Sequence, residues 1–407
     1  MSSSKHTNKP PFETIVRRSD IPQSASRPVA TPLFPSVVYA SPSADTLDAQ
    51  YEGKVDGYTY AREGHPNADI LASKIDSLEG IASDGDAPGG IVTSSGMGAI
   101  SAMFLGLLKH GDQVLAGDQL YGRSLRMLSQ DLPRLGFETG FFAASDAASL
   151  EAAIQPHTRM VMIEAVSNPT LRVADVAGIA ALAARHNLIL VVDNTFTTPA
   201  VFRPFDHGAN IIIHSVTKFL AGHSDVTLGY VAARDPEHRA TIYDAAVTWG
   251  MTPSPFDCWL AERGMHSFEV RFAAAQTNAA AIADGLAGLP GMRQVLYPGR
   301  ADHPDHALAT SLFGGAFGNM VSFEIEGGRA EVNRFIEAAG QIPFAPTLGD
   351  VATTLSHPAS SSHRALSADA RAALGMSEGF FRLSVGIEPA TLLLGELQAA
   401  LAAIKGT

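Results

Sequence analysis

Residues 209–225 read ANIIIHSVTKFLAGHSD. The part from Ala209 to His214 is apolar and β-branched, so it predicts a buried strand that delivers Lys218 to the edge of a sheet. A lysine that is desolvated there loses its charged form relative to the free amine, and a free amine condenses with an aldehyde to give a Schiff base. The alternative is an ordinary solvated lysine at a strand end. The residues around Lys218 must decide between a Schiff-base lysine and a solvated one.

The chain around this stretch alternates between strand and helix patterns. Apolar runs predict buried strands at 90–93, 113–116, 160–165, 188–192 and 211–214, and helical period predicts helices at 97–109, 122–135 and 173–186. Such alternation is typical of a largely parallel sheet that helices cover on both faces.

The two ends of the chain differ from this middle part. Residues 1 to about 60 contain Pro and Ser and show little helical period, so we expect an extended segment that packs along another surface. Near residue 254 the alternation stops: Ser254 can cap a helix, Pro255 suits a first helical position, and a long Ala-rich helical stretch follows. We expect that helix to lead into a second α+β domain.

Composition narrows the class of protein. A chain of 407 residues with 46% apolar residues suggests two domains. The net charge of −12, without a dense Lys/Arg cluster, argues against nucleic acid or an anionic membrane as the main partner and favours a small molecule. Cys258 is the only cysteine, residues 1–11 lack a secretory pattern, and no apolar run reaches membrane length. We therefore expect a cytoplasmic protein, and we expect no metal site.

The segment 93–98, TSSGMG, lies where a strand ends and a helix begins. Backbone N–H groups at such a helix start, without large side chains, form an anion cradle that suits a phosphate. An ordinary tight turn is the alternative. A dinucleotide fingerprint is a second alternative, with Gly96 and Gly98 as its first glycines and Asp118 as its acidic residue, but Ser101 stands where the third glycine belongs.

Three more residues follow predicted strands and so belong to the same edge of a parallel sheet. Tyr121 can place an aromatic face over a planar ligand, or simply pack. Asp193 is costly to bury without a positive partner such as a protonated ring nitrogen, although an exposed cap is the plain alternative. Asn168, before Pro169, can donate to an oxygen on a cofactor ring, or mark a turn. With Lys218, which lies 25 residues after Asp193, these are the parts of a pyridoxal phosphate site.

At this point the chain resembles the Cys/Met-metabolism family of pyridoxal-phosphate enzymes over about residues 25 to 405. The family includes cystathionine γ-synthases, cystathionine β- and γ-lyases, methionine γ-lyase and O-acylhomoserine sulfhydrylases. The matching motifs are Tyr60-Ala61-Arg62, Ser95-Gly96-Met97, Asp193-Asn194-Thr195, Ser215-Val216-Thr217-Lys218, Gly222-His223-Ser224-Asp225, His357-Pro358-Ala359-Ser360 and Arg382-Leu383-Ser384-Val385-Gly386.

The resemblance implies roles for particular residues. Lys218 forms the internal aldimine and shuttles protons, while Tyr121 stacks on the ring and acts as acid or base. The other implied cofactor-binding residues are Tyr60, Arg62, Ser95, Gly96, Met97, Asn168, Asp193, Thr195, Ser215 and Thr217, of which Tyr60 and Arg62 reach a neighbouring subunit. Arg382 holds the substrate α-carboxylate, and Thr347, Arg123 and Asn168 complete the implied substrate-binding set.

The resemblance also implies the architecture. We expect the PLP-dependent transferase fold (aspartate aminotransferase-like, fold type I), an α/β fold with a mostly parallel seven-stranded sheet. The expected domains are an extended arm (1–62) that contacts a neighbouring subunit, a pyridoxal-phosphate-binding large domain (63–256) and a smaller α+β domain (257–407). A homotetramer, arranged as a dimer of dimers with active sites shared between subunits, is implied.

The expected activity is elimination from a sulfur-containing or O-acylated amino acid, through aldimine and carbanion intermediates, by a carbon–sulfur lyase of methionine and cysteine metabolism. A γ-replacement transferase of trans-sulfuration, a synthase or sulfhydrylase, is the closest alternative; a nicotinamide oxidoreductase and a cofactor-binding protein without catalysis are others. Pro346 stands where γ-synthases and many γ-lyases carry Glu, and Arg123 where methionine γ-lyases usually carry Cys. His65, Asn67 and His266 also depart from the family pattern. Arg123 is either a solvent-facing rim residue or a contact for a polar or acidic substrate tail.

Overall fold

The structure is a computed structural model that describes residues 22, 24–81, 89–364 and 366–404. Contacts between Cα atoms divide the chain into two units, Met1–Leu33 and Phe34–Thr407. The described residues of the first unit form neither helix nor strand and are mostly exposed. This division does not test the expected domain bounds at 62/63 and 256/257, which stay predictions. Across the described ranges, no helix is long and apolar enough to cross a membrane.

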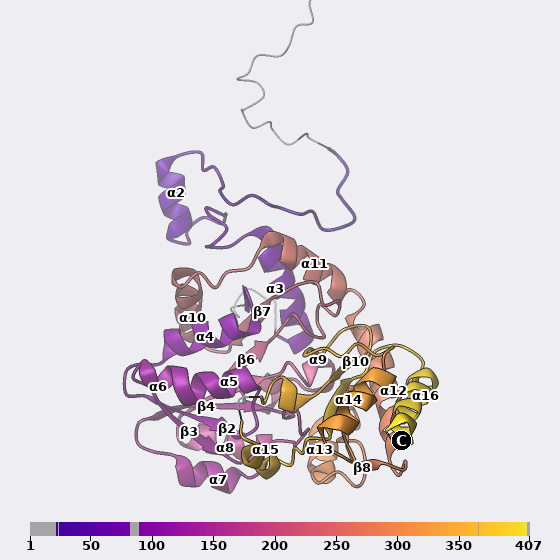
Figure 1. Cartoon of the computed structure of the whole chain (residues 1–407). Helices are drawn as coiled ribbons and strands as arrows, with labels where there is room; N and C mark the ends of the chain where they lie inside the picture. The colour runs from indigo at the N-terminus through magenta and orange to yellow at the C-terminus, as the bar shows by residue number, and fades with distance from the viewer. Residues whose placement is uncertain (1–21, 23, 82–88, 365, 405–407) are drawn as a thin grey trace, which may run out of the picture. The chain divides into compact units, whose positions relative to one another are not determined.

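A seven-stranded sheet in the second unit carries the residues of greatest interest (Figure 1). The strand order is β1-β7-β6-β5-β4-β2-β3, and all strands run parallel except β7, which is antiparallel to both of its neighbours. The strands are β1 (Ile91–Thr93), β2 (Gln113–Gly117), β3 (Glu138–Phe142), β4 (Thr158–Glu164), β5 (Ile189–Asp193), β6 (Ile211–His214) and β7 (Gly229–Ala233). The predicted mostly parallel sheet is confirmed, and six strands end at one common edge.

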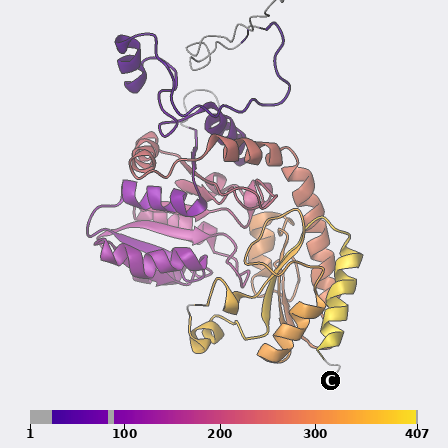
Figure 2. The ribbon, with the colours of Figure 1, turned by 45° about the horizontal axis from the view of Figure 1, so that its top comes forward.

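Buried apolar side chains alternate between the two faces of the sheet along each central strand. In β4, Met160 and Met162 belong to one buried cluster, whereas Val161 and Ile163 belong to another. Because side chains of a strand point alternately to opposite faces, each face needs its own layer of helices. Figure 2 shows helices on both sides of this sheet.

The two helix layers follow the two clusters. Helices α4, α6 and α10 contribute to one cluster, and α3, α7, α8 and α11 to the other. The bounds are α3 (Pro66–Glu79), α4 (Gly96–Leu107), α5 (Gly122–Arg126), η1 (Met127–Asp131), α6 (Leu132–Arg134), α7 (Ala147–Ala153), α8 (Val176–Arg185), α9 (Thr198–Val201), η2 (Pro204–His207), α10 (Pro236–Thr248) and α11 (Pro255–Met265).

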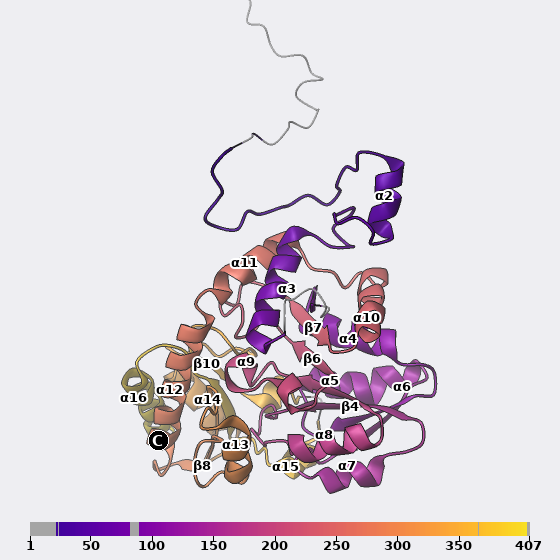
Figure 3. The ribbon, with the colours of Figure 1, turned by 180° about the vertical axis from the view of Figure 1, so that it is seen from behind.

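A second, antiparallel sheet has the order β10-β11-β9-β8 and packs with α12, α14 and α16 (Figure 3). Its elements are α12 (Phe268–Leu286), β8 (Met292–Leu296), α13 (His306–Phe313), β9 (Met320–Ile325), α14 (Arg329–Ala338), β10 (Thr354–Ser356), η3 (Pro358–Ser360), α15 (Ala368–Ala373), β11 (Phe380–Ser384) and α16 (Ala390–Ala403). Phe272 of α12 packs in a core of the first sheet and Ile282 in the core of the second, so α12 joins the two.

Several local expectations were wrong. The segment expected to be extended contains helix α2 (Ala44–Tyr51). The Ser43 side chain caps its start by accepting a hydrogen bond from the Thr46 N–H. The helix has eight residues and buries no side chain, so the sequence shows no helical hydrophobic period there. The helix expected at 122–135 is interrupted by the π-turn η1 just before Pro133, which lacks an N–H for the helical ladder.

The helical stretch after residue 254 also differs from the expectation. Ser254 occupies the N-cap position of α11, but its side chain makes no capping hydrogen bond. The expected long helix is two helices, because α11 ends at Met265 and α12 begins at Phe268. Strands β3 and β7 were not predicted from the sequence.

Candidate active site

The carboxyl ends of β1, β2, β4, β5 and β6 meet at one edge of the large sheet. Ligands of open parallel sheets bind outside this edge, because the loops there converge. The structure brings together at this edge the segments that hold Gly96, Tyr121, Asn168, Asp193 and Lys218, as the sequence predicted. The second sheet adds Arg382 from β11 and Thr347 from the loop before β10.

Lys218 lies four residues after β6, and its side chain is largely buried. Its Nζ donates to Thr347 Oγ1 at 3.3 Å. Burial, helped by the positive charge of Arg382, lowers the pKa of Lys218 from 10.5 to about 8. About one Lys218 side chain in ten is therefore a neutral, nucleophilic amine at pH 7.

The loop that contacts Lys218 depends on Gly349. This glycine has φ +84°, and a Cβ on it would lie 2.9 Å from Lys218 Cα. Its N–H donates to Ser384 Oγ of β11 at 2.9 Å. The loop therefore ties the lysine segment to the strand that carries Arg382.

Asp193 ends β5 and is only 9% exposed. Its Oδ1 accepts the backbone N–H of Thr195 at 3.0 Å and the Thr195 hydroxyl, while the Thr195 Oγ1 accepts the Ser215 N–H at 2.8 Å. Burial raises the pKa of Asp193, and hydrogen bonds from Thr195 partly oppose this. No ion pair to Asp193 is present among the described residues. A cationic ligand group is the partner that would stabilise its charged form.

The start of helix α4 lies beside the segment that follows β6. A Cβ on Gly96 would lie 2.9 Å from the Ser215 Cβ, so only glycine allows this approach. The Ser95 side chain caps the helix by accepting the Gly98 N–H at 2.9 Å. Within the described ranges, the N–H groups of Gly96 and Met97 have no acceptor. Two backbone donors at the positive end of a twelve-residue helix therefore remain for an anion.

Arg382 is 5% exposed, and two of its nitrogens are held in place. One terminal nitrogen donates to Asn168 Oδ1 at 2.6 Å and the other to the Thr347 carbonyl at 2.7 Å. Its Nε is buried without a partner in the part of the chain that the structure describes. Burial lowers the pKa of Arg382 to about 10. Such an under-satisfied, charged fork suits a carboxylate ligand.

The Asn168 loop is held from the second sheet. Ser322 of β9 donates to the Pro169 carbonyl at 2.6 Å, and Asn168 is buried. Because Ser322 pairs with Arg382 in the β9–β11 register, this contact sets Asn168 and Arg382 side by side.

Tyr121 precedes α5, the residue is 39% exposed, and its hydroxyl makes no hydrogen bond within the described ranges. Its backbone N–H donates to Glu164 Oε1 at 2.7 Å. The sequence analysis gave Glu164 no role. An acidic residue directly after an apolar run, the same signal that singled out Asp193, was present.

Four of the predicted residues lie apart from these contacts or are otherwise engaged. In the described part of the chain, no hydrogen bond or ion pair joins Tyr60, Arg62 or Arg123 to Lys218, and all three are exposed. Arg62 contacts the Tyr60 ring, 5.6 Å from its centroid. The Thr217 hydroxyl donates to the Leu228 carbonyl at 3.1 Å, so it can serve an anion only by giving up that bond.

The arrangement would suit a ligand with three groups: an anionic group at the start of α4, a cationic atom beside Asp193 and an electrophilic atom beside Lys218. A family model described as "Cys/Met metabolism PLP-dependent enzyme" matches residues 13–402. The chain belongs to this family. Pyridoxal phosphate carries all three groups, so the residues present fit the family's cofactor.

Similar proteins span nearly the whole chain. L-methionine gamma-lyase of Pseudomonas putida is 35% identical over 383 residues, 94% of each chain. O-succinylhomoserine sulfhydrylase of Pseudomonas aeruginosa is 34% identical over 393 residues, 97% of this chain and 96% of the relative. The crystal structure of cystathionine gamma synthase from Xanthomonas oryzae pv. oryzae in complex with cystathionine matches with a TM-score of 0.86 and 38% identity, covering 93% of this chain and 94% of that one.

These likenesses confirm the predicted family, fold and cofactor. The protein is a PLP-dependent enzyme of fold type I, a lyase or trans-sulfuration enzyme of methionine and cysteine metabolism, and it acts on a small amino-acid substrate. The nicotinamide alternative, which rested on Gly96 and Gly98, has lost its support.

Proposed function

We propose that this enzyme is a carbon–sulfur lyase that eliminates the β- or γ-substituent of a sulfur-containing or O-acylated amino acid. The observation that carries the proposal is that Lys218, whose pKa is lowered, and the buried guanidinium of Arg382 both hydrogen-bond to Thr347. Such an arrangement would provide a base and an α-carboxylate anchor for one amino-acid substrate.

Substrate binding depends on Arg382. Its buried guanidinium would pair with the α-carboxylate, while Asn168 and the Thr347 carbonyl fix the orientation of the fork. The carboxylate would satisfy the buried Nε, which otherwise lacks a partner within the described ranges. With one end anchored, the Cα–H bond is kept near the Lys218 amine.

Lys218 would act as the base. When bound, pyridoxal phosphate supplies a carbonyl that captures an amine and a ring that delocalises negative charge from Cα. The free Lys218 Nζ then takes the α-proton, and Thr347 Oγ1 keeps the amine in reach. The same amine can return a proton to the departing part of the substrate. Tyr121, beside it on the sequence-based assignment, would stack on the ring and serve as a second acid or base.

The remaining residues would hold the cofactor. Asp193, oriented by Thr195, would keep a proton at the ring nitrogen. The N–H groups at the start of α4, with Ser95 and Ser215, would bind the phosphate, with Thr217 joining if its hydroxyl turns from Leu228. Exposed Tyr60 and Arg62 would reach the phosphate of a neighbouring subunit in a homotetramer. Cytoplasmic residence also stays a prediction.

A replacement reaction is the second candidate. Arg123, the residue after Gly122, favours it. This arginine is exposed and forms no ion pair within the described ranges, so its guanidinium can bind an acidic acyl tail of the substrate. O-succinylhomoserine sulfhydrylase is also among the similar proteins. Against cystathionine as substrate, Pro346 beside Thr347 offers no carboxylate for a distal amino group.

Product analysis decides between these reactions. The holoenzyme is incubated separately with cystathionine, methionine, cysteine, and O-acetyl- or O-succinylhomoserine plus a thiol. Pyruvate indicates β-elimination and 2-oxobutyrate γ-elimination; either supports the lyase. If thioether products form and no oxo acid appears, the lyase proposal is wrong and the replacement reaction takes its place.

A further inference from the structure

Glu164 is a buried acid at the centre of the site to which the mechanism above gives no task. It ends β4 and lies in register with Asp193, which ends β5. Glu164 is 8% exposed, and its Oε2 is buried without a hydrogen-bond partner in the described part of the chain. A buried polar atom without a partner in a native fold calls for an explanation.

The geometry ties this acid to the turn that carries Tyr121. Glu164 Oε1 accepts the Tyr121 backbone N–H at 2.7 Å. From the other side, a Cβ on Gly122 would lie 2.2 Å from the Ser362 carbonyl oxygen, so the turn lies directly against the segment around residue 362. The turn thus has a hydrogen bond on the strand side and a close packing contact opposite.

The charges around Glu164 oppose its ionised form. Burial raises the pKa of Glu164 well above its ordinary value, and the neighbouring Asp193 carboxylate raises it further; Arg382 and the backbone groups of Tyr121 and Asn168 act in the opposite direction. A neutral acid still accepts a hydrogen bond through Oε1 and keeps one O–H donor.

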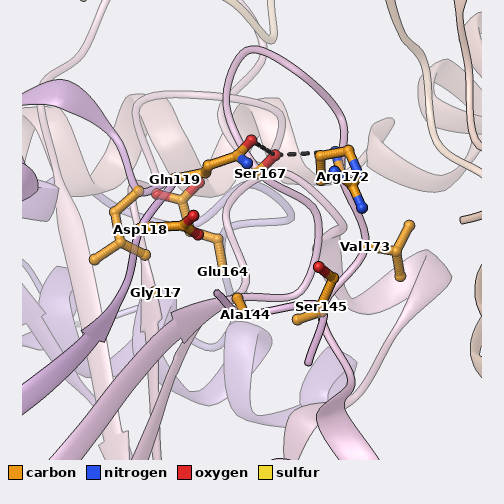
Figure 4. Close-up of a pocket in the computed structure, with 11 residues that line it drawn as sticks. Gly117, Asp118, Gln119, Ala144, Ser145, Glu164, Ser167, Arg172 and Val173 are labelled. Atoms are coloured by element: carbon orange, nitrogen blue, oxygen red, sulfur yellow. Dashed lines mark hydrogen bonds between the residues drawn. The ribbon is translucent and has the colours of Figure 1, made fainter. Parts of the chain in front are cut away.

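Glu164 also lines a small pocket at the sheet edge, together with Asp118 and Arg172 (Figure 4). Figure 4 shows Gln119, Ser167 and Arg172 joined by hydrogen bonds, 3.3 Å from the Ser167 hydroxyl to Gln119 and 2.9 Å from the Arg172 N–H to Ser167. Arg172 is itself paired with Asp305 at 2.6 Å, so it does not neutralise Glu164.

We propose that Glu164 is a positioning residue whose carboxyl group serves as a hydrogen-bond acceptor, and not as a negative charge, to hold Tyr121 against the cofactor. This rests on the stacking role proposed for Tyr121. On this proposal Glu164 sets the position of the Tyr121 ring, and proton transfer stays with Lys218 and Tyr121.

Three variants of the holoenzyme test this: E164Q, which keeps an oxygen acceptor, E164A, which removes it, and the control D118N. Asp118 is another acid of the same pocket and has no hydrogen bond to Tyr121 within the described ranges. The readouts are the visible circular dichroism of bound pyridoxal phosphate, which reports the contact with Tyr121, and the dissociation constant of pyridoxal phosphate.

We expect E164Q and D118N to match the wild type in the dichroic band and within about threefold in the dissociation constant. E164A should alter the band and weaken pyridoxal phosphate binding about tenfold, a factor that corresponds to about 1.4 kcal/mol. Equal impairment of E164Q and E164A would overturn the proposal, because the charge would then matter. Wild-type behaviour of E164A would overturn it as well.

If E164A does not fold, E164L, which fills the space without an acceptor, replaces it with the same expected and contradicting outcomes. Wild-type protein that fails to bind pyridoxal phosphate at Lys218 would contradict the proposed function, and this is established before any variant is compared.

Discussion

The buried environment of Lys218 predicts that its free amine is far more abundant at neutral pH than the free amine of an ordinary lysine. An ordinary lysine with a pKa of 10.5 is deprotonated in roughly one molecule in 3,000 at pH 7. Burial and the charge of Arg382 lower the pKa of Lys218 to about 8, a difference of 2.5 units. The free amine at pH 7 is therefore about 300 times more abundant at Lys218 than at an ordinary lysine.

Competitive acetylation of the apoprotein between pH 6 and 11 measures this directly, with each lysine quantified by peptide mass spectrometry. Lys54, whose side chain is 70% exposed, is the internal reference. The labelling midpoint of Lys218 should lie near 8, and R382Q should raise it because a nearby positive charge is removed. A midpoint for Lys218 that equals that of Lys54 would refute the reasoning from burial.

The same shift has a consequence for stability. Because the folded-state pKa of Lys218 is depressed, the unfolded apoprotein binds more protons than the folded one between about pH 8 and 10.5. The free energy of unfolding should therefore rise with pH through this window. K218M should lose that part of the rise.

Three further predictions concern the cofactor and the substrate. D193A should reduce turnover about a hundredfold or more, because the ring nitrogen loses its anionic partner; steady-state rates near the wild type would contradict this. R62A alone should weaken the retention of pyridoxal phosphate. If active sites are shared between subunits, mixing R62A with K218A subunits should restore activity. A mixture without activity would assign Arg62 to the active site of its own subunit. R123Q should raise the KM for O-succinylhomoserine about fivefold and leave the KM for O-acetylhomoserine unchanged. The matched control is R126Q, because Arg126 is a neighbouring arginine that lies 3.9 Å from Asp131. Equal effects of the two variants would assign Arg123 to the solvent-facing rim.

The sequence predicts the sheet edge of this enzyme well because its signals there are local. An apolar β-branched strand before Lys218 and small residues at 93–98 determine their own backbone geometry. Asp193 was found because a carboxylate directly after an apolar strand is costly to bury without a positive partner. These residues meet because parallel strands end together.

What the sequence did not reveal depends on contacts between distant segments. The partner of Arg382 is Asn168, 214 residues away, and the partner of Lys218 is Thr347, 129 residues away. A role for Glu164 could be inferred only from the structure, which shows that its Oε1 accepts the Tyr121 N–H. Helix α2 was missed for another reason: it buries no side chain and depends on the Ser43 cap.

Borohydride reduction of the yellow holoenzyme, followed by peptide mass spectrometry, tests the central claim most directly. The account predicts loss of the yellow colour and a reduced pyridoxyl label on the peptide that contains Lys218, with none on Lys54. A label on any other lysine, or protein that carries no label after incubation with pyridoxal phosphate, would contradict it.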